Sequence, residues 1–585
     1  MSEYKKLGES YKFFRYANSE PGEEVAISGF AGRFPESNNV EELKHNLFNR
    51  KDCITDENCR WKLDHPEIPK QIGKINNIEK FDALFFGIHF KEAHTMDPMC
   101  RMMLEHTYEA IVDAGYNPED IRGSKTGVFI GTCFFDSEAT WLHSKLQTNG
   151  FGITCCSRDM MAQNISFWLG VTGPSSLIDT GCSSSLYAVE HAYRAIRSGQ
   201  CDYAIVGGSN LCLHPYVSLQ LSRLGVLNQG GRCKVFDEDA NGYTRSEGVS
   251  VAFLQKTKTA KRIYATIIHA KTNCDGYKQE GIAFPSNKMQ STLFKEFYKE
   301  CNVSTDCIPY IEAHGTGTRV GDPVELNSID QIFSENTTKS LKIGSIKSNM
   351  GHTEGASGIS SIAKVIISME SGLIPPNINF HTPRKEVIER RNEVITEPTP
   401  LDGEYIAINS FGFGGANAHV LLKSNSKMKH NNGLQDDDLP RLVAVSGRTA
   451  EAVQTILNEI DNRSQDVEFI RLLHDVHHKA IPGHLYRGFI IADLKPSDTK
   501  VREIECFSGT KKPICFVFSG MDSQWLEMGQ ALMRLPIFAK SIEKCNSVLK
   551  SRKLNIYEIL TGKENNLLDN ILHSSVGIAA VQTEV

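Results

Sequence analysis

Three times in this chain, a short apolar run ends in a glycine-rich turn that leads into a segment with helical spacing. The runs are Pro174–Ile178, Ile308–Ala313 and a stretch that ends at Gly344. Strand, tight turn and helix in succession are typical of layered α/β folds. β-branched runs and helical patterns keep alternating from Val25 to about Leu422. We therefore predict an α/β layered body.

Composition supports a globular protein and excludes several other classes. Of 585 residues, 40% are hydrophobic and 23% are charged, which rules out a disordered, collagen-like or coiled-coil chain. The 64 Lys and Arg against 70 Asp and Glu give a net charge of −6, which indicates neither nucleic acid nor an anionic membrane as partner. The two longest uncharged stretches, Met160–Ile178 and Ala204–Ser222, contain Gly, Pro, Asn and Gln, so we interpret them as buried core.

The cysteines and the N-terminus predict a cytoplasmic location. The sixteen Cys are irregularly spaced, and the first residues, MSEYKKLGESYKFFRY, lack the apolar run of a signal peptide. Reduced thiols without a disulfide framework are then expected.

The sequence predicts four regions. Residues 1–23 form a polar lead-in, 24–423 the α/β body, and 424–510 a linker region that begins with a polar stretch. Residues 511–585 open with the strand signal Ile514–Phe518 and reach the last residue without a closing signal. We expect this last domain to be incomplete.

Cys182 is the first residue with chemical potential. It follows the run Pro174–Ile178 in the string Asp179–Leu186, and apolar residues then recur at helical spacing up to Ile196. The thiol is therefore expected at or near a helix N-terminus, where unpaired N–H groups and the helix dipole favour a thiolate. We accordingly expect a lowered pKa for this thiol.

Two histidines and a lysine occupy the other two turns. His314 stands in the loop after Ile308–Ala313, and Asp322–Pro323 is expected to begin the next helix as N-cap and first-turn proline. Lys347 and His352 share one glycine-bounded loop. Each residue alone is more often structural, but one Cys, two His and one Lys at three similar turns are the inventory of a thiol nucleophile with electrophilic or acid–base helpers.

These strings resemble the active-site motifs of β-ketoacyl synthases, the condensing enzymes of fatty acid and polyketide synthesis. They are DTGCSSSL at 179–186, EAHGTGT at 312–318 and GSIKSNMGH at 344–352, in the family's order and spacing. The resemblance covers roughly 24–423 and is closest to the ketosynthase of animal multifunctional fatty acid synthase, through strings such as FFGIHFKEAHTMDP at 85–98.

The resemblance implies a thiolase-like fold of two pseudo-equivalent α/β halves and a homodimer. Cys182 would be the nucleophile that accepts the acyl group, and His314 and His352 would receive the malonyl thioester carbonyl. Lys347 would orient His352 and support the local field. Phe413, in the string NSFGFGGANAH, would stand at the mouth of the acyl pocket as a gate.

The same resemblance implies the reaction and the partners. The Cys-bound acyl group would condense with malonyl-carrier protein, with loss of CO2, to give a 3-ketoacyl-carrier protein in fatty acid biosynthesis. Acyl and malonyl thioesters would arrive on the phosphopantetheine arm of an acyl carrier protein. No cofactor bound by the chain itself is expected.

Two departures from the family pattern bear on these expectations. Gly181 precedes the nucleophile where the family usually has Ala, and we expect little effect from it. The string ICFVFSGMDSQWLEMGQALM at 514–533 resembles the opening of a malonyl/acetyl transferase, and residues 424–510 resemble the small α/β domain that precedes it. The transferase nucleophile motif Gly-His-Ser-x-Gly does not occur in the sequence, so we expect no such transferase activity.

The sequence leaves other functions open. The chain could serve a polyketide synthase instead of a fatty acid synthase. It could act as a thiolase-like acyltransferase on coenzyme A thioesters, although the two-histidine pattern and HGTGT favour the synthase. It could also be an inactive relative that only dimerises or docks a carrier protein, against which the intact motifs argue.

Overall fold

The computed structural model describes residues 22–55, 60–61, 65–143, 150–333, 340–390, 392–425, 440–463, 466–492, 501–510, 513–520, 528–562 and 570–584. The predicted lead-in and most of the polar stretch after residue 424 lie outside the described residues. The chain divides into two compact units, residues 1–430 with 468–484, and residues 431–467 with 485–585.

The first half of the α/β body contributes five strands with one reproducible pattern of directions. The order is β5-β4-β6-β7-β1, in which β5, β4 and β6 run parallel and β7 and β1 follow antiparallel. The strands are β1 (Val25–Arg33), β4 (Thr126–Gly131), β5 (Ser175–Ile178), β6 (Tyr203–Asn210) and β7 (Gly248–Lys256).

The second half repeats this pattern in the order β10-β9-β14-β15-β8, again with three parallel strands followed by two antiparallel ones. Strand β12 pairs with β10 on its outer side, and β1 pairs with β8 to join the halves into one sheet. The predicted duplication is therefore present in the strand order itself. The strands are β8 (Ala265–Cys274), β9 (Tyr310–Glu312), β10 (Leu341–Gly344), β12 (Asn392–Val394), β14 (Tyr405–Phe411) and β15 (Ala416–Ser424).

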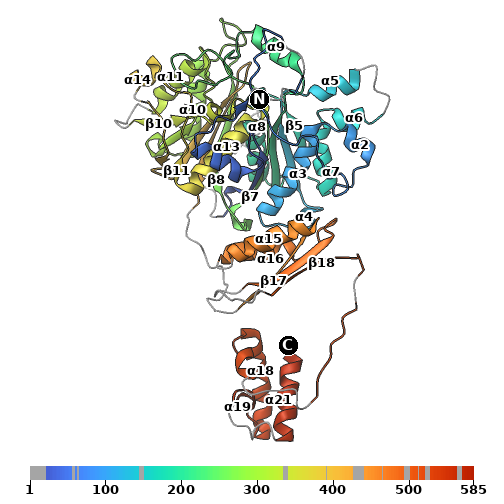
Figure 1. The fold of residues 1–585 in the computed structure, drawn as a ribbon. Helices are drawn as coiled ribbons and strands as arrows, with labels where there is room; N and C mark the ends of the chain where they lie inside the picture. The colour runs from blue at the N-terminus through green and yellow to red at the C-terminus, as the bar shows by residue number, and fades with distance from the viewer. Residues whose placement is uncertain are drawn as a thin grey trace, which may run out of the picture. The chain divides into compact units, whose positions relative to one another are not determined.

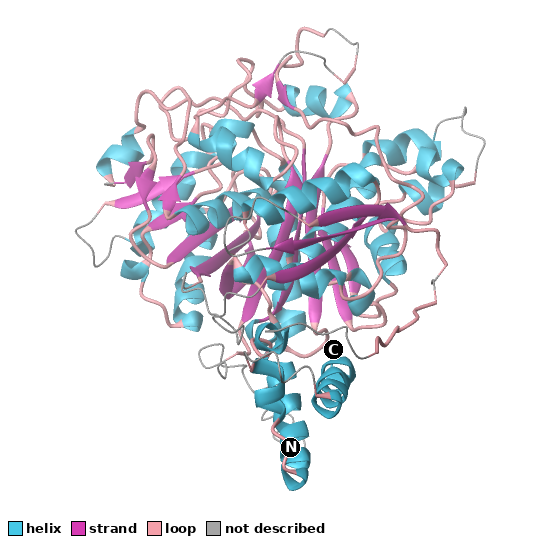
Figure 2. Ribbon diagram, turned by 60° about the horizontal axis from the view of Figure 1, so that its bottom comes forward, coloured by secondary structure: helices cyan, strands magenta, loops and turns pink. Residues whose placement is uncertain are grey.

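Helices complete a layered arrangement (Figures 1 and 2). Helices α8 (Ser184–Arg197) and α13 (Ser357–Ser371) pack against each other and contact strands of both halves. Helix α3 (Pro98–Asp113) covers the outer face of the first half, and α10 (Asn287–Cys301) that of the second. The central helix α13 is buried from Ser357 to Met369, which its serines, Gly358 and Ala363 allow because small side chains fit between two layers.

The other elements of this unit are short and connect the layers. They are α1 (Val40–Phe48), α2 (Phe90–Thr95), α4 (Pro118–Ile121), α5 (Asp136–His143), α6 (Gly152–Cys156), α7 (Met160–Leu169), α9 (Pro215–Arg223), α11 (Gly321–Phe333), α12 (Lys347–Met350), α14 (Lys385–Glu389), the 3-10 turns η1 (Thr257–Thr259), η2 (Thr305–Cys307) and η3 (Glu354–Ala356), and the strands β2 (Ile54–Thr55), β3 (Ile72–Gly73), β11 (Leu373–Ile374) and β13 (Thr399–Pro400).

The second unit begins with a small sheet in which β16, β17 and β18 pair antiparallel. Thr449 caps helix α15, whose buried residues Val453, Leu457 and Ile460 face this sheet. Helix α16 is largely part of the first unit, where the Asn117 side chain donates to the Val476 carbonyl at 2.8 Å. The elements are β16 (Arg441–Gly447), α15 (Ala450–Asn462), α16 (Val467–His477), β17 (Tyr486–Ala492) and β18 (Arg502–Cys506).

The predicted strand Ile514–Phe518 is not formed in the structure. Residues 513–520 have no regular secondary structure, and the side chain of Val517 is 87% exposed. A strand needs a neighbour for its backbone groups, and no described segment pairs with this one. The helices that follow, which share a core around Phe538 and Ile542, are α17 (Met528–Leu532), α18 (Pro536–Leu549), α19 (Ile556–Thr561) and α21 (Ile571–Glu584), with the 3-10 turn η4 (Lys550–Arg552).

Two predictions from composition can be compared with the described residues. No described helix is long and apolar enough to cross a membrane. The cysteines that the structure describes are free rather than joined in disulfides.

Candidate active site

Cys182 lies in the turn between β5 and α8, as the sequence predicts. Gly181 adopts a φ of +68°, in the left-handed region that favours glycine, and the chain turns sharply there. The hydroxyl of Ser184 ties the turn together, since it accepts from the N–H of Thr180 at 2.9 Å and donates to the carbonyl of Gly181 at 2.6 Å. The thiol is thereby presented just before the first turn of a buried helix.

Two serines of the second half fix the backbone of the nucleophile. The hydroxyls of Ser357 and Ser410 donate to the carbonyl of Cys182 at 2.8 and 2.9 Å. Ser357 begins α13 and Ser410 lies in β14. The Cys182 turn is therefore held by side chains of the opposite half.

The expected acidification of Cys182 is wrong. Desolvation raises the pKa of its thiol to about 11, and the charge of Glu354 acts in the same direction. The backbone N–H of Phe413, the charge of Lys347 and the N–H of Cys182 itself lower the pKa by less. The loss of hydration outweighs the helix N-terminus because a thiolate needs water or a close cation.

The GFGG turn of residues 412–415, between β14 and β15, lies against the nucleophile turn. A Cβ atom on Gly181 would lie 3.4 Å from the carbonyl oxygen of Phe413 and 3.5 Å from its nitrogen. The Phe413 side chain is 51% exposed. Phe413 thus meets the Cys182 turn through its backbone.

His314 follows β9 in a loop whose backbone N–H groups donate to the carboxylates of Glu325 and Asp322. Glu325 accepts from the N–H groups of His314 and Gly315, both at 2.8 Å. Asp322 is not the expected N-cap, because α11 begins one residue earlier, at Gly321. Its carboxylate instead accepts from the N–H groups of Gly317 and Phe236 at 3.0 and 2.9 Å, which fixes the loop rather than the helix end.

His352 is held by backbone on three sides. Its N–H donates to the carbonyl of Thr244 at 2.8 Å, and its carbonyl accepts from the N–H of Ser246 at 2.9 Å. The N–H of Glu354 donates to Nδ1 of the ring at 3.2 Å. An accepting Nδ1 places the proton of the neutral ring on Nε2. That Nε2 is buried and has no hydrogen-bond partner among the described residues.

The structure brings the two histidines together. The ring centroids of His314 and His352 are 5.5 Å apart, with the ring planes at 85°. Burial lowers the pKa of both rings well below the usual value, and the charge of Lys347 acts in the same direction. Both imidazoles are therefore neutral near pH 7 and able to donate a hydrogen bond without giving up a proton.

Lys347 supplies a buried positive charge beside these rings. It opens the short helix α12 and is 1% exposed. Its Nζ has no hydrogen-bond partner among the described side chains and backbone. Burial lowers the pKa of this ammonium, while the carboxylates of Glu312 and Glu325 raise it. An unpartnered buried ammonium is a group available to a ligand.

Sequence reasoning missed the residues that hold the site from outside it. Glu325, Ser357 and Ser410 belong to this group, and so does the buried ion pair of Arg245 and Glu354. Acidic and arginine residues inside otherwise buried, glycine-rich segments are the signal that could have pointed to them. Their partners come from distant parts of the chain, which periodicity alone does not reveal.

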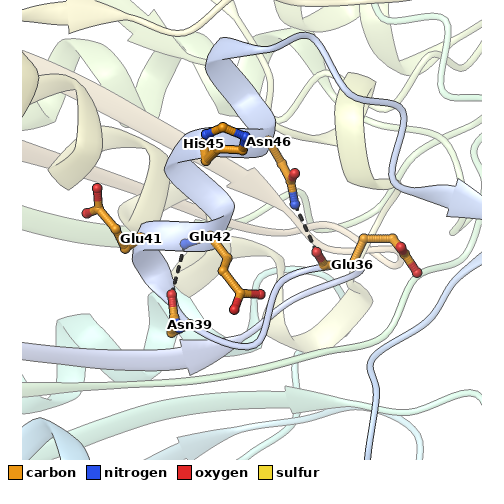
Figure 3. A pocket seen from close by; sticks show the side chains of 6 residues that line it. All are labelled: Glu36, Asn39, Glu41, Glu42, His45 and Asn46. Carbon is orange, nitrogen blue, oxygen red and sulfur yellow. Dashed lines mark hydrogen bonds between the residues drawn. The ribbon is translucent and has the colours of Figure 1, made fainter. Parts of the chain in front are cut away.

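A pocket beside α1 lies apart from these motifs (Figure 3). The N–H of Glu42 donates to the Asn39 side chain at 2.8 Å, and the Asn46 amide donates to the Glu36 carbonyl at 2.9 Å. These two bonds cap α1 and fix it to the loop before it, so the polar side chains of the pocket have a structural role. It is lined by Glu36, Asn39, Glu41, Glu42, His45 and Asn46.

Family models match almost the whole described chain. Residues 22–260 match the β-ketoacyl synthase N-terminal domain and 264–381 its C-terminal domain. Residues 383–491 match the ketoacyl-synthetase C-terminal extension, and 515–584 match part of an acyl transferase domain.

Individual proteins agree with the family models. A fatty acid synthase sequence of Anser anser anser is 48% identical over 351 residues, which is 60% of this chain and all of that sequence. The chain belongs to the β-ketoacyl synthase family. The ketosynthase from module 6 of the bacillaene synthase of Bacillus subtilis superposes with a TM-score of 0.71 at 32% identity, over 80% of this chain and 82% of that one. The fold is therefore thiolase-like, and the protein is a condensing enzyme of the acyltransferase class.

Other relatives are several times longer than this chain. The highly reducing polyketide synthase SAT13 of Stachybotrys chartarum is 33% identical over 566 residues, which is 90% of this chain. The chain spans 24% of the length of that synthase.

Proposed function

We propose that this ketosynthase joins a Cys182-bound acyl group to the two-carbon unit of malonyl-carrier protein, with release of CO2, in fatty acid biosynthesis. Cys182 is the acyl acceptor, and His314 and His352 bind the malonyl thioester carbonyl. Lys347 supports their field. Phe413 stands as the gate of the acyl pocket, which its place beside the Cys182 turn supports.

Loading is a thioester exchange. The sulfur of Cys182 attacks the acyl carbonyl of an acyl-carrier thioester, the carrier sulfur leaves, and the thiol proton ends on the released carrier thiol. The backbone N–H groups of Cys182 and Phe413 bond to the sulfur and favour the thiolate, although burial keeps the pKa of the thiol raised. The same donors are placed to stabilise the oxyanion of the tetrahedral intermediate.

Condensation follows when the malonyl group loses CO2. The electron pair of the broken C–C bond becomes an enolate, whose oxygen the two neutral imidazoles stabilise. The enolate carbon attacks the acyl carbonyl, the Cys182 sulfur leaves as a thiolate, and a proton from solvent restores the thiol. Each donor of this kind is worth roughly 3 kcal/mol in the transition state.

The tautomer of His352 is the strongest support for this proposal. The N–H of Glu354 occupies Nδ1 of His352, so the proton is on a buried Nε2 that has no partner among the described residues. A neutral donor left unpaired in a buried site is costly unless a ligand oxygen completes it. An enolate oxygen is the ligand that the reaction supplies.

Partners and setting form part of the same proposal. The chain takes its acyl and malonyl thioesters from the phosphopantetheine arm of an acyl carrier protein, binds no cofactor of its own, and works as a homodimer in the cytoplasm. The relatives in multidomain synthases support a carrier supplied by a larger assembly. Residues 515–584 match an acyl transferase domain in part, and the Gly-His-Ser-x-Gly nucleophile motif does not occur in the sequence.

A polyketide product is the second candidate. The polyketide synthase SAT13 matches over 90% of this chain, but at 33% identity, whereas the fatty acid synthase reaches 48% over a shorter stretch. The higher identity favours fatty acids. Incubation with acyl carriers of increasing length distinguishes the two, since a fatty acid enzyme accepts successive saturated chains.

The decisive experiment is intact-protein mass spectrometry. The chain is mixed with a medium-chain acyl-carrier thioester, any adduct is mapped, and malonyl-carrier protein is added. We expect an acyl mass on Cys182 that leaves as 3-ketoacyl-carrier protein. A folded protein without an adduct would favour a docking role, and discharge only by acetyl-coenzyme A would favour a thiolase.

A further inference from the structure

An ion pair that the mechanism does not use lies directly beside the active-site histidine. Nε and Nη2 of Arg245 donate to the two carboxylate oxygens of Glu354 at 2.8 and 2.9 Å. Arg245 is 2% exposed and Glu354 1%. The remaining Nη1 of Arg245 donates to the hydroxyl of Ser218 at 3.0 Å. A buried ion pair adds little to stability, because desolvation offsets the attraction.

The same two residues bracket His352 through their backbones. Thr244 and Ser246, the neighbours of Arg245, pair with the carbonyl and N–H groups of His352. Glu354 donates its N–H to Nδ1 of the ring. Arg245 is therefore linked to His352 in two ways, through the backbone bonds of its chain neighbours and through Glu354, whose carboxylate it binds.

Glu354 also has an unfavourable backbone conformation. Its φ is +46°, in the left-handed region that side chains other than glycine rarely adopt. Such strain persists only where surrounding contacts over-determine the conformation, and it gathers at functional sites. The bidentate ion pair with Arg245 is a contact that holds Glu354 in this conformation.

We propose that Arg245 and Glu354 are positioning residues for His352, and that their ion pair holds the Glu354 N–H on Nδ1 so that Nε2 is the donor. This inference rests on the proposed function, because it assigns a cause to the tautomer that the decarboxylation step uses. Neither side chain is required to touch substrate.

The proposal predicts that a Glu354 variant loses malonyl decarboxylation while the Cys182 thiol keeps its reactivity. Glu354→Gln keeps the side-chain shape but replaces one acceptor oxygen with an N–H2 that faces the guanidinium. We expect the turnover number for malonyl decarboxylation to fall about tenfold, with KM within about twofold. Alkylation of Cys182 by iodoacetamide is expected at least as fast as in wild type, because a nearby negative charge is gone.

A matched pair of variants separates positioning from stability. Glu354→Ala and Glu354→Gly both leave Arg245 without its partner, but only glycine adopts a φ of +46° without backbone strain. We expect the glycine variant to decarboxylate several-fold faster than the alanine variant, relative to acyl loading measured on the same samples.

Asp113→Asn is the control, because it weakens another carboxylate–arginine pair, with Arg262, away from these motifs. It is expected to leave the ratio of decarboxylation to loading unchanged. Parallel loss of both half-reactions in Glu354→Gln, or full decarboxylation in folded Glu354→Ala, would overturn the proposal. Wild-type protein that releases no CO2 from malonyl-carrier protein would instead contradict the proposed function itself.

Discussion

The turn after β5 and the turn after β10 occupy the same place in the two halves of the body. β5 ends the three parallel strands of the first half, and β10 holds the equivalent place in the second half, where β12 is added outside it. Each turn leads to a central helix, α8 or α13. The first turn presents Cys182, and the second presents Lys347 and His352. The repeated strand order thus provides one corner for a nucleophile and an equivalent corner for hydrogen-bond donors.

The difference between the corners lies in their immediate partners. Cys182 has backbone N–H groups against its sulfur, whereas Nε2 of His352 has no partner among the described residues. Two serines then tie the corners together through the Cys182 carbonyl. The fold fixes where a group stands, and a few local hydrogen bonds decide which chemistry it performs.

The largest expected effect comes from removing the nucleophile. Cys182→Ala should abolish acyl loading, because no other group at this turn can form the thioester. Malonyl decarboxylation should persist, since it depends on the other corner. Intact mass and CO2 release, measured on the same preparation, test this. Retained acyl adduct at this turn would contradict the assignment of Cys182.

The reciprocal change is in the second corner. His352→Ala removes a donor to the enolate oxygen, so decarboxylation should fall by roughly a hundredfold or more. Loading of Cys182 should stay within about threefold, because its donors are the N–H groups of Cys182 and Phe413 and not the ring of His352. Unchanged CO2 release would remove His352 from the mechanism and break the comparison between the corners.

The raised pKa of Cys182 gives a third test. A thiol with a pKa of about 11 gains thiolate continuously as pH rises, so alkylation by iodoacetamide should increase. Between pH 9 and 10 we expect about a tenfold increase, where an ordinary thiol has levelled off. Mapping the exposed Cys307 in the same digest provides the internal reference. A plateau below pH 9 would show that the helix N-terminus prevails after all.

The sequence predicted the strand-turn-helix corners well because each is local. The run before Cys182, its turn and the helix from Ser184 all follow from periodicity and glycine. Its pKa did not follow, because desolvation depends on side chains packed from elsewhere. The prediction of a strand over Ile514–Phe518 was also wrong. Its apolar pattern is typical of a strand, but a strand forms only where a neighbouring segment pairs with it.

Glycine in the second corner sharpens the comparison. Gly351 has a φ of +79°, and a Cβ there would lie 2.9 Å from a methyl carbon of Ile54 and 3.1 Å from the Thr244 carbonyl. Gly351→Ala should therefore destabilise the protein by about 2 kcal/mol or more, through both backbone strain and crowding. The midpoint of thermal unfolding measures this. An unchanged midpoint would mean that Ile54 and Thr244 move aside at little cost in free energy.

The smallest effect is expected at the matching glycine of the first corner. Gly181 has a φ of +68°, but the nearest atom to an added Cβ is 3.4 Å away, which is ordinary contact. Gly181→Ala should cost only about 1 kcal/mol, from the left-handed backbone alone. Gly199→Ala is the control, because Gly199 lies just after α8 with a φ of +74° and has no atom within 4 Å of an added Cβ. Equal shifts of the thermal midpoint in these two variants, with slower acyl loading only in Gly181→Ala, would place the difference at the nucleophile. A loss at Gly181 as large as that at Gly351 would mean that the two corners are equally crowded, contrary to the contacts described here.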